Sequence, residues 1–527
     1  MALFSSSPEL LVLSILVVVV LGGLYIIKCR SSSQNNPSSS VPRNWPVVGI
    51  LPSLVLNLHR LRDYVLEISS TVHTLKVGIA TIRIFITSHP ENLQHIFTTN
   101  QANYPKGEEF AEIFDVARGT LFTVDGELFR RSRANHQGVL SNPLLVGLMI
   151  KSCRDKVEED LLPLMAHLAT TRAPVDMSDL MVRLVFDLNV MSVFGMDPAR
   201  LSSQNHDRMP PPMGVANAMD TVMEVGFLRH IVPPSCWKAM RRLNIGQERR
   251  LSAAQAVLRN FAADMIAERR RIKKKGLLIQ VGQEPVDVMS SYIDDPSYIS
   301  NDDNLLQATL ITYMIAGRDT VSTTLPWIFY NLSKHPHVVS AIRDELAPIV
   351  SRKAPSAAAA PTTTTMLLFE AEEVKPLVYL QAVLLETLRL YPPIPMVRKS
   401  VAAEDVMPTG DKVCAGDIVL VSLQSTGRME AVWGPDSQEY RPERWLLKDG
   451  RLRHVPSHKF PAFVMGPRLC LGKDIAMALL KIIVASVVWN FDVDVLDGQV
   501  IRTKLSCLLQ MKDGLKVMLN KRERSSM

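Results

Sequence analysis

The sequence predicts a mainly α-helical fold with a minor β part, behind a single N-terminal transmembrane helix. Three observations predict it: an uncharged apolar run near the N-terminus, one short β-branched stretch, and long amphipathic segments through most of the remaining chain. With 527 residues, of which 47% are hydrophobic, the chain can bury a large core. Because no internal repeat appears after residue 45, we expect one large unit rather than several modules.

The N-terminal segment has the length and composition of a membrane span. Leu10–Ile27 carries no charge and has about the 18 to 20 residues that a helix needs to cross a bilayer. A cleaved signal peptide is the alternative, but no basic region precedes the run and no small-residue cleavage site follows it. Glu9 precedes the run and Lys28 follows it, so the positive-inside rule places the C-terminal part in the cytosol. We therefore expect residues 1–30 to be a single-pass anchor in the endoplasmic reticulum membrane.

The rest of the chain divides into a linker and one domain. Residues 31–46 are polar and rich in proline, so they are expected to connect the anchor to a domain over residues 47–527. Val77–Thr87 is β-branched and partly alternating, which predicts paired strands. Lys353–Thr365 has low complexity and is expected in a surface loop. Amphipathic patterns predict helices near residues 145–168, 215–230, 245–275, 302–335 and 374–390.

Charge and cysteine usage exclude several classes of function. The net charge of +7 is modest for this length, and the basic residues are not arranged with aromatic residues as on a nucleic-acid surface. No nucleic-acid partner is therefore expected. The six cysteines show no CxxC pair and no zinc-type spacing to histidine. A cytosolic domain also argues against disulfides, so each cysteine has to be judged by its neighbours.

One cysteine lies in a distinctive pattern. FVMGPRLCLG, Phe463–Gly472, fits FxxGxRxCxG at every fixed position, with Cys470 as its cysteine. Gly466 allows a tight turn, Gly472 lets the backbone pass close to a flat ligand, and Phe463 offers a packing face. A helix starting near Lys473 would direct its N-terminal amides towards the sulfur and favour the thiolate. A thiolate is the form that an iron ligand requires.

Together with three further motifs in the same order, this pattern resembles the cytochrome P-450 family of haem-thiolate monooxygenases. The resemblance extends over nearly all of the chain after residue 41 and implies that family's fold. It implies haem b with Cys470 as the axial iron ligand. The first further motif is AGRDT, Ala316–Thr320, whose Gly317 and Thr320 could open a groove for oxygen in an apolar helix. By resemblance, Thr320 positions a water and bound dioxygen, and Asp319 relays protons. An ordinary polar patch is the alternative.

The other two motifs supply charges with a structural role. ETLR contains Glu386 and Arg389, and PERW contains Arg444. The resemblance implies that these three form a buried network that holds the cysteine loop in place. An acid and an arginine three residues apart are common on helix surfaces, so ETLR alone carries little weight.

The haem propionates need cationic partners. The candidates come from three segments: Arg468, Arg133, and Arg398 or Lys399. Phe129 occupies the position where the family's WxxxR pattern has tryptophan. The indole hydrogen bond to a propionate is therefore absent, and we expect weaker haem retention with unchanged iron ligation.

The resemblance also implies the reaction and its partners. A thiolate pushes electron density onto the iron and favours cleavage of the O–O bond, so O2-dependent monooxygenation of a hydrophobic small molecule is expected. No GxGxxG or flavin-binding module is present, so electrons must come from another protein. We expect NADPH-cytochrome P-450 reductase to dock on the face near Cys470.

Within the family, the sequence resembles plant fatty-acid and mid-chain alkane hydroxylases. The likeness includes NYPKGEEFAEIFDVARG from Asn103 and GRMEAVWG from Gly427, but Ile394–Lys399 is less polar than in alkane hydroxylases. Hydroxylation of long aliphatic chains is the leading expectation. Oxidative phenol coupling in plant alkaloid synthesis is the alternative. A haem-thiolate isomerase or dehydratase, which needs no external electrons, is disfavoured because Asp319 and Thr320 are both present.

Overall fold

The structure is a computed structural model. It describes residues 53, 56–57, 60–79, 82–199, 201, 214–274, 286–293, 302–353 and 366–522. The expected anchor, the linker and nearly all of the low-complexity loop lie outside these residues. Among the described residues, no helix has the length and apolar character needed to cross a membrane.

The predicted fold class, mainly helical with a minor β part, is confirmed. The α-helices in chain order are α3 (Leu61–Thr71), α4 (Pro90–Gln94), α5 (Glu108–Ile113), α6 (Gly126–Leu140), α7 (Pro143–Lys156), α8 (Leu162–Thr171), α9 (Met177–Phe194), α10 (Gly214–Ile231), α11 (Pro234–Leu243), α12 (Gly246–Lys274), α14 (Val288–Ile293), α15 (Asp303–Lys334), α16 (Pro336–Lys353), α17 (Ala371–Val374), α18 (Val378–Leu390), α19 (Leu423–Thr426), α20 (Glu430–Trp433) and α21 (Lys473–Asn490). Short 3-10 or π turns are η2 (His95–Thr99), η3 (Gln101–Asn103), η4 (Asp115–Ala117), η5 (Val157–Leu161), η7 (Pro442–Trp445) and η8 (Gly466–Arg468).

Of the predicted helices, one contains a π turn and one is interrupted, in both cases next to a proline. The pattern near residues 145–168 contains α7, the π turn η5 and α8, and Pro163 lies in the first turn of α8. The pattern near residues 374–390 divides into α17 and α18, with Pro376 between them. Proline has no N–H and crowds the preceding turn, so an amphipathic pattern can continue where the helix does not. The predicted helices matching α10, α12 and α15 are continuous.

The strands form three small sheets. They are β1 (Thr74–Ile79), β2 (Ile82–Thr87), β3 (Val175–Asp176), β4 (Met396–Ser400), β5 (Asp405–Val406), β6 (Lys412–Val413), β7 (Ile418–Ser422), β8 (Phe491–Val495) and β9 (Lys516–Lys521). The largest sheet has the order β1-β2-β7-β4. The predicted pair near residues 77–87 is confirmed as the antiparallel pair β1 and β2. Its other two strands come from the C-terminal half, so this sheet joins distant parts of the chain.

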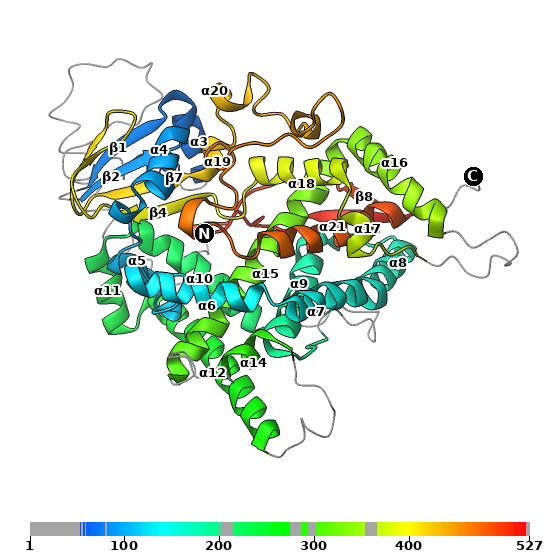
Figure 1. Ribbon diagram of the computed structural model, residues 1–527, viewed down its shortest axis with the longest axis horizontal. Coiled ribbons are helices and arrows are strands. Elements are labelled where there is room, and N and C mark those ends of the chain that lie inside the picture. Colours follow the sequence, from blue (N-terminus) through cyan, green and yellow to red (C-terminus); the bar gives the residue numbers. More distant parts are fainter. Residues whose placement is uncertain are drawn as a thin grey trace, which may run out of the picture.

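Helix α15 runs through the middle of the molecule, with the four-stranded sheet to one side (Figure 1). The Asp302 side chain caps its N-terminus by accepting hydrogen bonds from two backbone amides. The first half of α15 packs in one hydrophobic cluster with α10, α12 and α14, and its second half packs in another with α18 and α21. The helix thus links both core regions, and its central residues lie where the two clusters meet.

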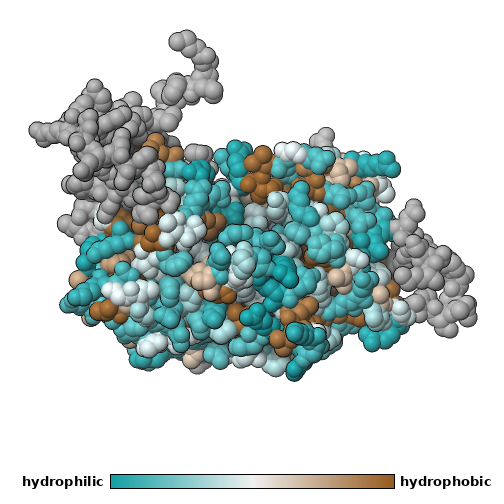
Figure 2. Space-filling view, turned by 90° about the horizontal axis from the view of Figure 1, so that it is seen from above, coloured by the Kyte–Doolittle hydropathy of each residue, from teal (hydrophilic) through white to brown (hydrophobic). Residues whose placement is uncertain are grey.

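The face of the molecule seen in Figure 2 is mainly hydrophilic, with hydrophobic residues in small separate groups. The large apolar side chains of the described residues are mostly buried inside. Because this surface is mainly hydrophilic, we expect a binding site for an apolar ligand in the interior.

Candidate active site

A large internal cavity brings most of the predicted site residues together. Its volume is about 1190 Å³, and its walls include Asp319, Thr320 and Cys470. Ligand pockets commonly measure about 300 to 1,000 Å³, so this cavity has room for a cofactor and a substrate together. Its lining comes from α15, the cysteine loop, α10, β4 and the loop near residue 507.

The cysteine loop is held in an unusual backbone conformation. Gly466 has φ +63, and a Cβ there would lie 2.2 Å from the carbonyl oxygen of Phe97, so only glycine fits. Val464 has φ 59, which is strained for a β-branched residue. The Cys470 amide donates to the Phe463 carbonyl at 3.0 Å and closes the loop. This conformation places Cys470 against the cavity, where its side chain is accessible although it lies deep within the protein.

The groups expected to favour a thiolate are present around Cys470. Helix α21 begins at Lys473, as predicted. Burial nevertheless raises the pKa of Cys470, and it outweighs the opposing backbone hydrogen bond at Gly472 and the charges of Arg133 and Lys473. The surrounding groups therefore stabilise a thiolate, but not enough to offset the effect of burial, so the thiol is favoured. The charge of a bound metal ion would supply the remaining stabilisation of the thiolate.

A second cysteine, Cys507, also lines the cavity. Burial raises its pKa to about 12. Its amide donates to the Met223 carbonyl at 3.2 Å, so it belongs to the C-terminal loop that packs on α10. Unlike Cys470, it has no glycine turn and no helix N-terminus beside it.

Arg468 is positioned beside the cysteine by three contacts. Its Nη2 donates to the Val124 carbonyl and to Asp125, both at 2.6 Å. Its guanidinium lies 3.9 Å from the centre of the Phe129 ring. Phe129 therefore keeps the packing role of an aromatic side chain at this position, although it has no N–H to donate. The buried Nε of Arg468 has no hydrogen-bond partner among the described residues.

Lys106 is a cavity residue that the sequence analysis missed. Its Nζ lies 4.1 Å from the centre of the Phe110 ring and 4.0 Å from that of Phe122. Burial lowers the pKa of Lys106 well below its usual value, and the nearby charges of Arg468 and Lys399 lower it further. In the sequence, Lys106 lies within NYPKGEEF. That segment indicated a likeness to the family but gave no separate prediction for its lysine.

Lys106, Arg133 and Arg468 form a basic cradle on the cavity wall. The cost of burying these charges falls when an anionic group binds beside them. The two carboxylates of haem b match this cradle, and the accessible sulfur of Cys470 matches its iron. These residues therefore fit the cofactor that the sequence pattern implies.

The structure separates Arg398 from Lys399. They are neighbours on β4, so their side chains leave opposite faces of the strand. The Lys399 Nζ donates to the Tyr104 carbonyl at 2.8 Å, and burial and then Arg468 lower its pKa to about 7. Arg398 instead forms an ion pair with Glu109. Of the two, Lys399 lies in the electrostatic environment of Arg468.

The AGRDT segment lies inside α15 and faces the cavity. The Thr320 hydroxyl donates to the Ala316 carbonyl at 2.9 Å, which satisfies it within the helix. A Cβ at Gly317 would lie 2.0 Å from the Asn189 amide nitrogen, so the Asn189 side chain on α9 occupies the space that a larger residue would need. Because Asp319 is also buried, the segment is not an ordinary polar surface patch.

A buried charge cluster surrounds Asp319. Arg318 is 1% exposed, and its Nη1 donates to both Asp319 and Asp220 at 2.6 Å. Lys504 lies 3.6 Å from Asp220. Burial raises the pKa of Asp319 to about 6, with Arg318 opposing the rise and Asp220 adding to it. The sequence analysis did not predict Asp220, because it belongs to no motif. Its contact with Arg318 exists only because the fold packs α10 against α15.

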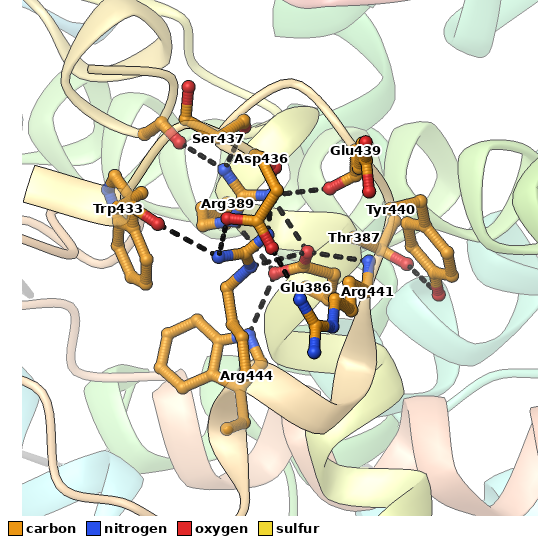
Figure 3. A network of polar contacts seen from close by, with 12 residues as sticks. Glu386, Thr387, Arg389, Trp433, Asp436, Ser437, Glu439, Tyr440, Arg441 and Arg444 are labelled. Atoms are coloured by element: carbon orange, nitrogen blue, oxygen red, sulfur yellow. Dashed lines mark hydrogen bonds and ion pairs between the residues drawn. The ribbon is translucent and has the colours of Figure 1, made fainter. Parts of the chain in front are cut away.

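The predicted network of Glu386, Arg389 and Arg444 is present and buried (Figure 3). Arg389 donates to both carboxylate oxygens of Glu386 at 2.7 Å, and Arg444 donates to one at 3.1 Å. The Trp445 indole, missed in the sequence, donates to Glu386 at 2.9 Å. The amide of Arg441 donates to the same carboxylate at 2.8 Å.

Arg389 and Arg444 also bind backbone carbonyls of the loop that follows α19. These are the carbonyls of Gly427, Trp433, Asp436, Ser437 and Glu439. A network that starts from one helical carboxylate thereby holds a long irregular segment, which leads into the cysteine loop.

Substituting Glu386 with glutamine should destabilise the protein strongly, because it removes the carboxylate that pairs with the fully buried Arg389 and one of the two that pair with Arg444. We expect the free energy of unfolding to fall by about 3 to 5 kcal/mol, as measured by urea denaturation. Glu268→Gln is a matched control, since Glu268 and Arg271 form a pair of the same residue types and spacing on the surface. That control should show no measurable loss; equal losses in both variants would contradict the role of the network.

Substituting Asp220 with asparagine should lower the pKa of Asp319. The change removes a charge that raises this pKa and leaves Arg318 to Asp319 alone, so both effects act in the same direction. The infrared band of the protonated Asp319 carboxyl, identified by its loss in Asp319→Asn, should disappear at lower pH than in the native protein. An unchanged midpoint would show that Asp220 does not influence Asp319.

The comparisons with known proteins agree on one family. The sequence model of the family Cytochrome P450 matches residues 39–519. Noroxomaritidine synthase 2 of Narcissus aff. pseudonarcissus MK-2014 is 34% identical over 506 residues, which cover 94% of each chain. Alkane hydroxylase MAH1 of Arabidopsis thaliana is 33% identical over 491 residues, covering 91% of this chain and 93% of its own.

Cytochrome P450 86B1 of Arabidopsis thaliana is 34% identical over 488 residues, covering 90% of this chain and 85% of its own. The residues that the family model matches include those of the cavity, the cysteine loop and the Glu386 network. The chain therefore belongs to the cytochrome P450 family, whose members are oxidoreductases that carry haem on a cysteine thiolate.

Proposed function

We propose that this chain binds haem b through Cys470 and hydroxylates a long aliphatic substrate with O2. The observation that carries the proposal is the single cavity whose wall contains Cys470, the basic cradle, and Asp319 with Thr320. As a member of the family, the protein is a monooxygenase that uses O2, a redox partner and a hydrophobic substrate. The identity of the substrate and the roles of individual residues are the parts proposed here.

The residues of the chain have distinct roles in this proposal. When bound, the haem supplies the iron chemistry that cleaves dioxygen and attacks an unactivated C–H bond. Cys470 holds the iron, and Lys106, Arg133, Lys399 and Arg468 balance the propionates. Asp319, with a pKa of about 6, can hold and release a proton near neutral pH. The Thr320 hydroxyl, one turn from Ala316, orients a water at the cavity wall.

The cavity lining favours an aliphatic substrate over a cationic aromatic amine. Much of the lining is apolar, and it includes Phe114, Met149 and Leu188. Its carboxylates among the described residues are Asp63, Glu224 and Asp319, whereas basic side chains are more numerous. A protonated amine would meet a net positive wall, which costs free energy in a low-dielectric interior.

Sequence identity alone does not select the substrate. The relative named alkane hydroxylase and the relatives named noroxomaritidine synthase have similar identity to this chain. Oxidative coupling of phenols therefore remains the second candidate function, supported by the aromatic rings of Phe110, Phe114 and Phe122. The presence of both Asp319 and Thr320 at the cavity favours proton delivery during oxygen activation over an isomerase or dehydratase.

The proposal also includes an electron source and a location. We propose that NADPH-cytochrome P450 reductase supplies the electrons and that residues 1–30 anchor the protein in the endoplasmic reticulum membrane. The apolar, uncharged run at Leu10–Ile27 supports the anchor. An anchored enzyme with an apolar cavity could take long-chain substrates directly from the bilayer.

Substituting Cys470 with serine should abolish thiolate ligation. We expect the reduced native protein with carbon monoxide to show a strong band near about 450 nm, the mark of a thiolate ligand, and Cys470→Ser to lack it. Cys507→Ser is a matched control, because Cys507 lines the same cavity, and it should keep the band. Loss of the band in Cys507→Ser, or its persistence in Cys470→Ser, would overturn the assignment.

A substrate panel tests the aliphatic proposal. The native protein, reductase and NADPH are incubated with a long-chain alkane, a long-chain fatty acid and a diphenolic amine. We expect hydroxylated aliphatic products and no turnover of the amine, because the cavity is apolar and net positive. Turnover of the amine alone, detected by mass spectrometry of the products, would replace the proposal with phenol coupling.

A further inference from the structure

Arg398 is a buried charge on the cavity wall that does not belong to the basic cradle, so its role is not explained by binding of the propionates. Its side chain is 5% exposed, and it lines the cavity from β4 beside Met396. Its ion-pair partner is Glu109 of α5, which contacts Nη2. The buried Nε has no hydrogen-bond partner among the described residues. A guanidinium has five N–H donors, so one carboxylate at Nη2 leaves much of its binding capacity unused.

His230, near the C-terminal end of α10, lies next to this guanidinium. Its Nδ1 is 3.4 Å from Arg398 Nη1. Because a guanidinium can only donate, Nδ1 must be the accepting nitrogen, and Nε2 then carries the proton. Burial, followed by the charges of Arg398 and Lys106, lowers the pKa of His230 to about 3, so the ring is neutral at pH 7. The Nε2–H is thus a second donor on the same stretch of wall.

Apolar rings surround these two donors. The His230 ring lies 5.8 Å from that of Phe114 and 6.2 Å from that of Phe110. Both phenylalanines line the cavity as well. A charged group with two donors in an apolar pocket is the usual arrangement for binding one anionic or strongly accepting group at the end of a hydrophobic ligand.

We propose that Arg398 and His230 bind the carboxylate end of a long-chain acid substrate. This inference rests on the proposed aliphatic hydroxylase function and narrows its substrate to acids rather than unsubstituted alkanes. The chain of the acid extends from this end group along the apolar wall towards Cys470. Arg398 binds through a bidentate or single charge-assisted contact, and His230 adds a neutral hydrogen bond.

Glu109 is a competitor for the same guanidinium. It is 33% exposed, whereas Arg398 is almost fully buried, so Glu109 can turn towards solvent when a substrate carboxylate arrives. The contact with Glu109 keeps Arg398 paired while the substrate is absent. Removing the Glu109 charge should therefore strengthen acid binding, which is the opposite of the effect of removing Arg398.

Equilibrium dialysis of labelled dodecanoic acid and 1-dodecanol against the haem-loaded protein at pH 8 tests the proposal. The two ligands have the same chain, and only the acid is charged at this pH. For Arg398→Gln, we expect the Kd of the acid to rise about 10- to 100-fold and that of the alcohol to change little. For Glu109→Gln, the Kd of the acid should fall and that of the alcohol should stay the same.

Arg502→Gln is the matched control, because Arg502 also lines the cavity but is 59% exposed and paired with Asp513. It should leave both Kd values unchanged. Haem content and the carbon monoxide spectrum are measured for every variant. Loss of haem in Arg398→Gln would assign Arg398 to a propionate and overturn the inference.

Two further outcomes are distinguishable. If the native protein binds acid and alcohol equally and Arg398→Gln weakens both alike, the end-group site is wrong while the aliphatic function stands. If the native protein binds neither ligand, the proposed aliphatic function fails, and the inference fails with it.

Discussion

The hydrogen bonds made by the Glu386 carboxylate are the constraint on which the rest of the site depends. This fully buried anion accepts from Arg389, Arg444, Trp445 and the backbone of Arg441. Removing a charge from water is costly, so such a cluster exists only when every partner is in place. The same arginines bind carbonyls of an irregular segment that would otherwise have no regular hydrogen bonding.

The wall of the cavity shows a different situation, in which basic side chains outnumber carboxylates. Lys106 packs against two aromatic rings and lies near Asp125, the carboxylate that also pairs with Arg468, and the Arg468 Nε has no hydrogen-bond partner among the described residues. We interpret these basic groups as binding partners of the haem propionates. Arg398 differs from them in its partner, because its carboxylate is Glu109, whereas that of Arg468 is Asp125. One cavity therefore contains two basic regions, which we assign to the cofactor and to the substrate.

Helix α15 contacts both α9 and α10 beside the cavity. Gly317 allows close approach to Asn189 of α9, while Arg318 joins Asp319 to Asp220 on α10. The same helix α10 carries His230 near its end. The Arg318 and Asp319 side chains of α15 are therefore buried and paired rather than exposed to solvent.

The sequence by itself determined the fold class, the family and the motif residues, because each of these leaves a local signature. The helices appear as amphipathic periods, the β1–β2 pair as a β-branched run, and Cys470 as one position of a ten-residue pattern. Phe129 could likewise be recognised as a departure from WxxxR. Pro163 and Pro376 were visible too, but periodicity alone did not show that a π turn precedes the first and that the helix is interrupted at the second.

Only the tertiary structure decided which charges meet. No local pattern predicts the contacts of Lys106, Asp220 and His230, and although Trp445 belongs to PERW, only the structure shows that it donates to Glu386. The division between Arg398 and Lys399 depends on the two faces of β4, whose surroundings come from α5, α10 and the segment near Tyr104. The reason is physical: a pKa, an ion pair or a binding pocket depends on distances and burial, and these are set by packing between segments remote in sequence.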